Sequence, residues 1–289
     1  MPDQRNGLLW GSFVADALSL GPHWIYDQNK IKEHFEPLTG YTDPLPGSYH
    51  PNRKAGQFTH YGDQAMTLFK SILVKGRYDA FEFQDEWKMM WGEYDGYIDG
   101  ATKESLNQLA RGRDTGSKSS DFSGASRIAP VLHAHWDASL ADQLTAARNQ
   151  TATTHNHPDV LDAASLLTRV VNEIKQGRSV TDALNIAVTS FAENSLIQTS
   201  LLKATALKDN PDAPNQLGLS CDVTEALPTT LWFLITCGDN LKEALVQNAM
   251  AGGDSAARAM AIGMITGAAH GKESIPEDWV NGLETKPSV

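Results

Sequence analysis

Apolar residues recur at intervals of three and four along nearly the whole chain, and this spacing constrains the fold more than any other feature. In the first segment, Leu8, Leu9, Phe13, Val14 and Ala17 lie on one stripe when the chain is drawn as a helix. The pattern does not alternate with the period of two that marks a half-buried strand. The sequence therefore predicts an all-α protein.

Local signals indicate where several helices begin and end. Ser179 is followed three residues later by an acidic residue, as at many helix starts. Pro158 and Pro276 suit a first helical turn, and Gly271 suits a helix stop. Together with the apolar spacing, these signals predict helices over residues 63–75, 80–95, 99–110, 126–136, 138–149, 158–176, 179–192, 195–207, 222–236, 241–250, 254–270 and 276–283.

Three aperiodic stretches interrupt this pattern, at residues 36–61, 111–124 and 209–220. The first is rich in Pro and Gly, which is typical of a functional loop in a compact helical domain. The third holds two prolines and is expected to connect helices. No stretch is long or biased enough to be an interdomain linker, so the sequence predicts one all-α domain over residues 1–289.

Charge and composition exclude several classes of function. The 289 residues include 24 Lys and Arg against 35 Asp and Glu, and the resulting net charge of −11 repels nucleic-acid backbones and anionic lipids. No segment approaches the roughly 20 apolar residues of a membrane span, and the first residues lack a secretory pattern. Cys221 and Cys237 show no metal-ligand spacing and are expected to be buried bystanders. We therefore expect a cytoplasmic protein that contacts neither nucleic acid nor membrane.

The most informative segment lies near the end of the chain. Gly252 and Gly253 precede Asp254 and Ser255, and a helix of small residues follows. Such a segment presents backbone N–H groups and a carboxylate at one helix start, which suits a polar ligand. The alternative is that Asp254 only caps the helix and that the glycines further along let another helix pack closely.

Other segments combine polar groups with a predicted helix start. Asp63 lies where the Pro-rich and Gly-rich loop becomes an apolar helix, and it is either a ligand or a cap. His155 and His157 flank one residue before Pro158, but no third His or Cys follows at zinc spacing, which favours loop hydrogen bonds. Arg127 suits a phosphate or a neighbouring carboxylate.

Asp16 stands among apolar residues of the first predicted helix. A buried acid is unfavourable unless it pairs or accepts hydrogen bonds, so Asp16 is a stronger site candidate than an exposed acid. The alternative is a structural acid that holds a neighbouring loop.

Taken in chain order, five segments resemble the ADP-ribosylglycohydrolase family, and in particular its branch that contains the J-type crystallins. The resemblance implies a single all-α orthogonal bundle whose central cleft, in active members, holds two Mg²⁺ ions and ADP-ribose. The segments are GSFVADALSLGPHWIYD (11–27), YGDQAMTL (61–68), FSGASRIAP (122–130), THNHPDVLDAA (154–164) and AGGDSAARAMAIGMITGAAHG (251–271).

The chain departs from the family's metal-binding pattern. Where active members read Thr-Asp-Asp-Thr, residues 61–64 read Tyr-Gly-Asp-Gln, and where they read Gly-Gly-Asp-Thr-Asp-Thr, residues 252–257 read Gly-Gly-Asp-Ser-Ala-Ala. Each motif keeps one of its two carboxylates. Mg²⁺ requires near-octahedral oxygen ligands, so we expect one ion at most, held by Asp63 and Asp254. Arg258 is expected to replace part of a lost cation by pairing with Asp254 and with Asp63.

The resemblance also assigns roles to residues of this chain. Asp63 and Asp254 are the predicted catalytic residues, with Asp16 supporting the cleft. The predicted substrate-binding residues are Ser123, Gly124 and Arg127 for the diphosphate, His155 and His157 near the ribose, and Gly252, Gly253, Ser255 and Arg258.

These roles predict a hydrolase that acts on an ADP-ribosyl or related nucleotide-sugar bond, in a small molecule or an ADP-ribosylated substrate. Two alternatives remain: a binding protein that accepts the nucleotide-sugar without turnover, and a structural, crystallin-like protein.

Overall fold

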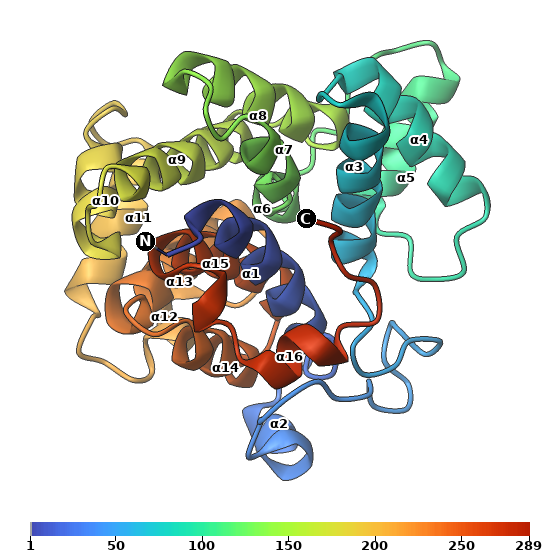
Figure 1. The fold of residues 1–289 in the computed structure, drawn as a ribbon. Coiled ribbons are helices and arrows are strands. Elements are labelled where there is room, and N and C mark those ends of the chain that lie inside the picture. Colours follow the sequence, from blue (N-terminus) through green and yellow to red (C-terminus); the bar gives the residue numbers. More distant parts are fainter. Residues whose placement is uncertain (1) are drawn as a thin grey trace.

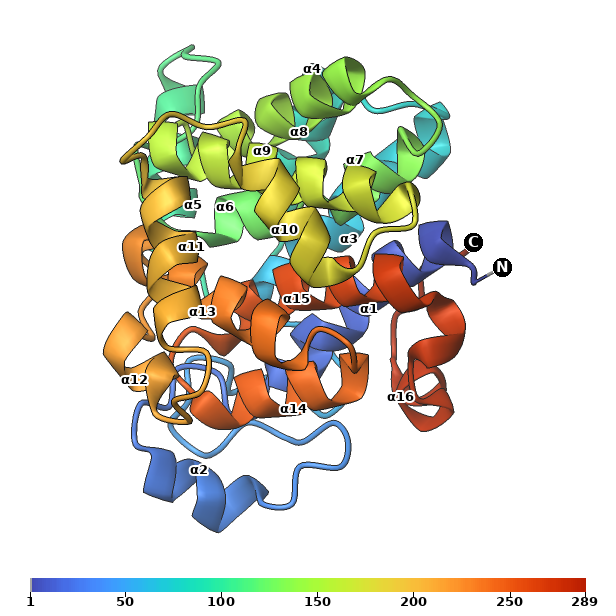
Figure 2. The ribbon, with the colours of Figure 1, turned by 90° about the vertical axis from the view of Figure 1, so that its left-hand side faces the viewer.

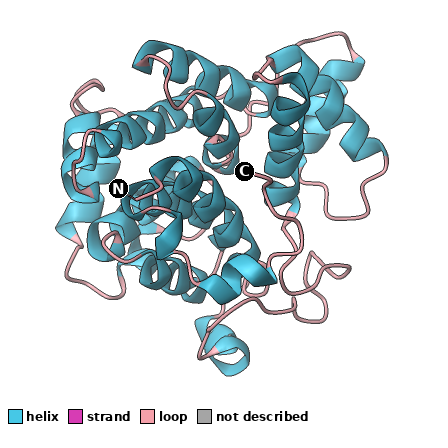
Figure 3. Ribbon diagram, viewed as in Figure 1, coloured by secondary structure: helices cyan, strands magenta, loops and turns pink. Residues whose placement is uncertain are grey.

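The computed structural model describes residues 2–289, and these residues form helices joined by loops (Figure 3). In this part of the chain, extended pairing is limited to two isolated bridges, Ser117 with His155 and Asp121 with Asp222. The prediction of an all-α protein is confirmed. Among the same residues, no helix is both long and apolar enough to cross a bilayer.

Sixteen α-helices and one short 3-10 helix follow one another along the described chain. They are α1 (Gln4–Ser19), α2 (Gln28–Phe35), α3 (His60–Lys75), α4 (Ala80–Gly92), α5 (Gly100–Ala110), α6 (Ser123–Ser126), α7 (Ala129–Ala134), α8 (Leu140–Thr154), α9 (Pro158–Lys175), α10 (Val180–Val188), α11 (Leu196–Ala206), α12 (Ala213–Leu217), α13 (Val223–Cys237), α14 (Leu241–Ala251), α15 (Ser255–His270), η1 (Lys272–Ser274) and α16 (Glu277–Gly282).

Helices α1 and α15 form the central pair of the bundle, with the other helices arranged around them (Figures 1 and 2). Their backbones approach closely because glycines face each other across the contact. A Cβ atom added at Gly7 would overlap the carbonyl oxygen of Gly267, and one added at Gly11 would overlap that of Gly263. This contact places the start of α15, and therefore Asp254, beside the end of α1.

Most predicted helices are present, and three differences have local causes. The predicted helix over 126–136 is two helices, α6 and α7, and Pro130 lies in the first turn of the second. Helix α12 begins inside the stretch predicted as a connecting loop, again with a proline in its first turn. The short helix α2 was not predicted, because only Ile31 and Phe35 of its residues are buried and the apolar stripe is brief.

Helix α3 begins earlier than predicted, and this affects the site. It starts at His60 rather than at Asp63, because Thr59 caps it by accepting a hydrogen bond from the N–H of Tyr61 at 3.1 Å. A helix turns by about 100° per residue, so an earlier start changes which side chain faces the centre of the molecule. Tyr61 is fully buried, whereas Asp63 is partly exposed.

Candidate functional site

The loop before α15 fixes the position of Asp254. Gly252 and Gly253 have positive φ angles of 79° and 63°, which L side chains rarely adopt. The loop runs between two backbone segments: the N–H of Gly253 donates to Ile25 and the N–H of Asp254 donates to Leu219, both at 2.8 Å. A Cβ atom at either glycine would overlap these carbonyl oxygens. The two glycines are therefore required by backbone contacts.

Asp254 is both the N-cap of α15 and part of a cluster of acids. One carboxylate oxygen accepts from the N–H of Ala257 at 3.4 Å, and the other accepts from the hydroxyl of Tyr61 at 3.0 Å. Potential ligand atoms of Asp121, Cys221 and Asp254 lie within 4.8 Å of one another. We call these three residues the acidic group. Asp254 is fully buried, and the other two are partly exposed.

Two loops from different parts of the chain bring Asp121 and Cys221 together. The N–H of Phe122 donates to the carbonyl of Cys221 at 2.8 Å, next to the bridge between Asp121 and Asp222. The N–H of Ser123 donates to Asp121 at 2.8 Å and orients its carboxylate. Sequence reasoning missed both residues, although Asp121 lies immediately before a segment that it identified. The expectation that Cys221 is a buried bystander is wrong, because it is partly exposed and adjoins two acids.

The acidic group holds its protons more tightly than isolated side chains would. Burial and the charge of Asp254 raise the pKa of Asp121 above its ordinary value. Burial also raises the pKa of Asp254, although the charge of Arg258 and the hydrogen bond from Tyr61 oppose that rise. Burial and both acids raise the pKa of Cys221 to about 12, so the thiol is neutral at physiological pH. Two close carboxylates of raised pKa favour a state in which they share one proton.

Three buried histidines lie together, and one of them, His23, reaches Asp254; none of the three was predicted as a site residue from the sequence. The Nδ1 atom of His23 lies 3.9 Å from Asp254 and accepts a hydrogen bond from the N–H of Ala256 at 3.3 Å. His50 and His60 contact each other at 3.3 Å between ring nitrogens, and His60 lies 3.1 Å from Asp99.

Burial lowers the pKa of His23 well below its usual value and that of His50 to about 3, so both rings are neutral. Despite its burial, Asp99 keeps a pKa below the usual range because His60 hydrogen-bonds to it. His23 lies within the segment of residues 11–27 on which the family resemblance rests, and that membership was the one signal that could have pointed to it.

Aromatic rings line the surface beside these histidines. Trp24, Tyr49 and Tyr97 pack edge to face with centroids 4.9 to 5.2 Å apart, and we call them the aromatic rim. Trp24 has a positive φ of 63°, and its ring stacks on His23 at 4.3 Å. A cavity of about 260 Å³ adjoins the rim and is lined by Trp24, Tyr49, His23 and Lys30, among others. Tyr49 is exposed, and Trp24 and Tyr97 are partly exposed, so the rim offers aromatic surface that suits a flat ring such as a nucleobase.

Asp63 does not join the acidic group. Its carboxylate accepts from Arg53 at 2.7 Å and from the hydroxyl of Tyr94 at 2.7 Å, in a separate surface cavity of about 330 Å³. Burial raises the pKa of Asp63, and Arg53 and Tyr94 limit the rise. The prediction that Asp63 and Asp254 hold one ion together is therefore corrected: the structure pairs Asp254 with Asp121.

Arg258 does not pair with Asp254 or Asp63. No ion pair within 4.0 Å joins them among residues 2–289. The buried guanidinium instead donates to the side chain of Asn248 at 3.0 Å and to two carbonyls, of Leu219 at 3.2 Å and of Gly252 at 2.5 Å. Those carbonyls flank the loop that holds Asp254. Arg258 thus braces the loop, and the predicted ion pair is wrong because backbone oxygens occupy its donors.

Asp16 holds the start of α3. Its two carboxylate oxygens accept from the N–H and the hydroxyl of Thr59, at 2.8 and 2.6 Å. The side chain is fully buried, and burial raises its pKa to about 8. Of the two hypotheses for Asp16, a site residue or a structural acid that holds a neighbouring loop, these contacts match the second.

Arg127 and His155 form an internal network behind the acidic group. Arg127 donates to the carbonyl of Ser123 at 3.0 Å, to Thr154 at 2.8 Å and to Gln64, and it is buried. Burial and the charge of Arg127 lower the pKa of His155 to about 3. The ring of His155 packs on Gly124, where an added Cβ atom would overlap it.

The donors of Arg127 are thus occupied inside the protein rather than directed at a ligand. His157 is partly exposed, and its Nδ1 atom is buried without a hydrogen-bond partner. Ser255 is buried at the start of α15, and its hydroxyl likewise lacks a partner.

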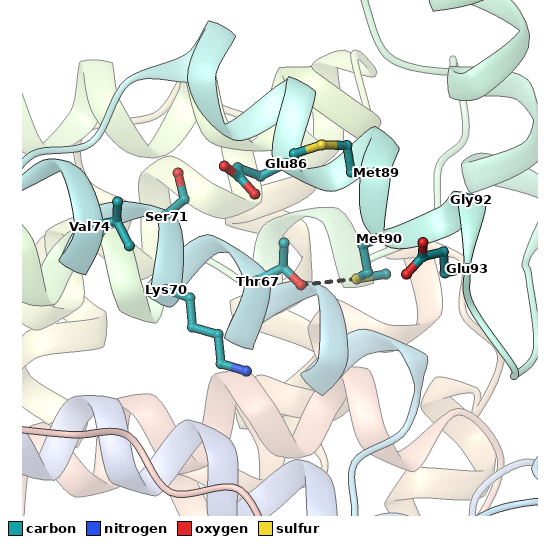
Figure 4. Close-up of a pocket in the computed structure, with 9 residues that line it drawn as sticks. All are labelled: Thr67, Lys70, Ser71, Val74, Glu86, Met89, Met90, Gly92 and Glu93. Carbon is teal, nitrogen blue, oxygen red and sulfur yellow. Dashed lines mark hydrogen bonds between the residues drawn. The ribbon is translucent and has the colours of Figure 1, made fainter.

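A larger surface cavity lies elsewhere, between α3 and α4, with a volume of about 700 Å³ (Figure 4). It is lined by Thr67, Lys70, Met89 and Met90, among others, and the hydroxyl of Thr67 contacts the sulfur of Met90 at 3.0 Å. Lys70 and Glu86 point away from each other in Figure 4. No predicted site residue lines this cavity, so its size does not make it the candidate site.

The side chains present do not fit two Mg²⁺ ions. The acidic group offers two carboxylates and a neutral thiol, enough for one Mg²⁺ that keeps several waters, and it leaves no carboxylate for a second ion. Ala256 and Ala257 are buried and add no side-chain oxygen, and the carboxylate of Asp63 is occupied by Arg53. A carboxylate at position 62 is also excluded, because a Cβ atom added there would overlap Asp16.

An all-helical bundle with a buried acid at the start of α15 is the combination of fold and site to compare with known protein families. The family model described as ADP-ribosylglycohydrolase matches residues 3–289, so the chain belongs to the ADP-ribosylglycohydrolase family. The resemblance expected from the sequence is confirmed.

Particular relatives include proteins named as hydrolases and proteins named as crystallins. The chain is 24% identical over 290 residues to the ADP-ribosyl-dinitrogen reductase glycohydrolase of Rhodospirillum rubrum, covering 98% of this chain and 91% of the relative. It is 21% identical to crystallin J1A of Tripedalia cystophora (96% and 91% covered) and 24% identical to the ADP-ribosylhydrolase ARH3 of Homo sapiens (96% and 88% covered). A solved structure, an ADP-ribosylglycohydrolase-related protein complex, matches with a TM-score of 0.74 at 21% identity, covering 98% and 92%, and supports the fold.

Proposed function

We propose that this protein hydrolyses the bond between an ADP-ribosyl group, or a closely related nucleotide-sugar, and its acceptor. The observation that carries the proposal is the close pair of acids, Asp121 and Asp254, one partly exposed and one buried. Membership of the family supports the reaction class, and the two relatives named as glycohydrolase and hydrolase support the ADP-ribosyl substrate.

Two acids that share one proton supply a general acid and a general base at one site. Asp121, the partly exposed member, donates its proton to the leaving group as the bond to the anomeric carbon breaks. The hydroxyl of water then joins that carbon, and Asp254 accepts the remaining proton. Ionised Asp254 also stabilises the positive charge that develops on the sugar. Proton transfer back to Asp121 restores the starting state.

Neighbouring residues support this assignment. Ser123 orients Asp121 through its backbone N–H, and the loop of Gly252 and Gly253 orients Asp254. We assign the aromatic rim to the base of the nucleotide, since exposed rings stack well on one another. We retain His157 as the candidate for contact with the ribose, because its side chain is partly exposed.

We place the protein in the cytoplasm, acting on a small-molecule or ADP-ribosylated substrate. Both cysteines are free, which suits a reducing compartment, and the net charge of −11 disfavours nucleic acid as a partner.

The test is the release of free ADP-ribose from a panel of peptides that carry it on arginine, serine or glutamate, measured by chromatography. We expect release from at least one linkage, and its loss in Asp254→Asn and Asp121→Asn. Asp85→Asn, which removes an exposed acid of α4, is the matched control and should keep the activity. Turnover that survives both site substitutions contradicts the proposal.

Non-catalytic binding is the second candidate, and one observation favours it. The hydroxyl of Tyr61 lies against both acids of the pair, at 3.0 Å from Asp254 and 3.5 Å from Asp121, which limits access to them. On this candidate, ADP-ribose raises the melting temperature but no linkage in the panel is cleaved. A crystallin-like structural protein shows neither effect.

A further inference from the structure

Tyr61 contacts both acids of the pair from the side of the protein core. Its hydroxyl lies 3.0 Å from Oδ2 of Asp254 and 3.5 Å from Oδ2 of Asp121, and its ring is fully buried. A divalent ion that bridged these two oxygens would have to lie about 2.1 Å from each for Mg²⁺. The phenol oxygen already lies near both, so the ion and the hydroxyl compete for the same region.

The surroundings hold Tyr61 in this place. Its backbone N–H is fixed by Thr59, which is in turn held by Asp16. Its ring lies against His60 with centroids 4.0 Å apart and meets His23 edge to face at 5.8 Å. A rotation that freed the two acids would have to displace these buried rings. The hydroxyl is therefore part of the packed structure.

Two other charged side chains, Arg258 and Asp63, also leave no role for a bound cation at the acidic group. Arg258 contributes a fixed positive charge near Asp254 and braces its loop through the carbonyl of Gly252. Asp63 is neutralised by Arg53 in a different cavity. The charge of Asp254 is thus balanced by hydrogen-bond donors and by a guanidinium that belong to the chain itself.

We propose that the acidic group works without a metal ion, and that the hydroxyl of Tyr61 occupies the region a bridging cation would take. Tyr61 is thereby a positioning residue: it hydrogen-bonds to Asp254 and excludes the ion. The inference deepens the proposed function, on which its relevance to catalysis rests. It predicts hydrolysis by Asp121 and Asp254 that needs no divalent cation.

The direct test is binding of Mn²⁺, measured by the loss of the free-ion electron paramagnetic resonance signal, on the full-length protein. We expect the wild-type protein to bind no Mn²⁺ at the acidic group, so that Asp254→Asn causes no loss of bound Mn²⁺. Tyr61→Phe keeps the ring and removes the hydroxyl, and we expect it to gain about one bound Mn²⁺, because two carboxylates then face a space without a donor. The double variant Tyr61→Phe with Asp254→Asn should lose that gain.

Each result decides the inference. Wild-type Mn²⁺ binding that disappears in Asp254→Asn overturns it. A folded Tyr61→Phe variant that gains no Mn²⁺ also overturns it, because the hydroxyl is then not what excludes the ion. Tyr61→Leu serves as the second variant if circular dichroism shows that Tyr61→Phe has not folded, and the wild-type measurement decides independently of both.

Activity separates this inference from the proposed function. Release of ADP-ribose that persists in EDTA supports both. Release that EDTA abolishes and Mg²⁺ restores upholds the proposed function and overturns the inference. Absence of release, together with absence of Mn²⁺ binding in wild type, overturns the proposed function and leaves the metal-free site standing.

Discussion

The starts of α3 and α15 look alike in the sequence and differ in the structure. Each carries an acid after glycine, with an apolar helix following. Asp254 is the N-cap of α15 and faces Tyr61 and Asp121, whereas Asp63 lies inside the first turn of α3 and faces Arg53. The comparison shows that the residue at which a helix begins decides whether an acid near its start reaches the centre of the protein.

The most direct test of the difference between the two helix starts is to neutralise the two acids separately. We expect Asp254→Asn to lower kcat/KM for ADP-ribose release by at least about 100-fold, the smaller end of the usual acid-base contribution. Asp63→Asn should change it little, because Arg53 and Tyr94 hold Asp63 away from the pair. Steady-state kinetics measure both. Equal losses in the two variants contradict the distinction drawn between the two helix starts.

A second test adds a side-chain atom at the start of α3. Gly62→Ala places a Cβ atom against the carboxylate of Asp16 and against Phe58, and we expect it to lower the free energy of unfolding by about 2 kcal/mol, a typical cost of overpacking. Gly92→Ala, at the end of α4, is the matched control, because a Cβ atom there meets nothing within 4 Å. Urea denaturation measures both, and equal stability of the two variants contradicts the crowding at Gly62.

The buried acid under α3 should make stability depend on pH. Because burial raises the pKa of Asp16 to about 8, folded Asp16 keeps its proton at pH values where unfolded Asp16 has lost it. The folded state then binds more protons, so this residue's contribution to stability falls as pH rises from about 4 to 8, by at most about 1.4 kcal/mol per pH unit.

Asp16→Asn should remove that contribution, which is measured as a difference in slope between the two proteins. The acidic group at α15 titrates too, but it is present in both proteins and cancels from the difference. Identical slopes mean that Asp16 is ionised in the folded state.

The smallest expected effect belongs to the pair of Arg53 and Asp63. Both side chains are partly exposed, at 20% and 24%, so solvent screens their attraction. We expect a coupling energy of less than about 1 kcal/mol from a double-mutant cycle with Arg53→Gln and Asp63→Asn. A coupling of several kcal/mol shows that α3 depends on this pair more than its exposure implies.

The periodic apolar spacing predicted much of the fold but only part of the candidate site. The spacing predicted α9 from Pro158 and α15 from the residues after Asp254, because local signals mark both helix starts. It did not predict that Asp121 meets Asp254, since that contact depends on how two distant loops pack. Nor did it predict the start of α3 at His60, which Thr59 and the buried Asp16 determine together.

The directions of long side chains were the least predictable feature. Arg258 follows Asp254 by four residues, which on an isolated helix favours an ion pair. In the folded chain, carbonyls of Leu219 and Gly252 accept its donors, and these oxygens belong to segments that no local pattern relates to α15. A buried guanidinium bonds to whichever acceptors the tertiary structure places around it.

The glycine contact between α1 and α15 has a consequence for how the molecule is made. Helix α1 leaves the ribosome well before α15, because most of the described chain lies between them. Until α15 has been made, the glycine-bearing face of α1 lacks the partner that covers it in the folded protein, so the nascent chain must remain soluble without its central contact. Asp254, at the start of that late helix, completes the acidic group, so an unfinished polypeptide lacks the assembled candidate site.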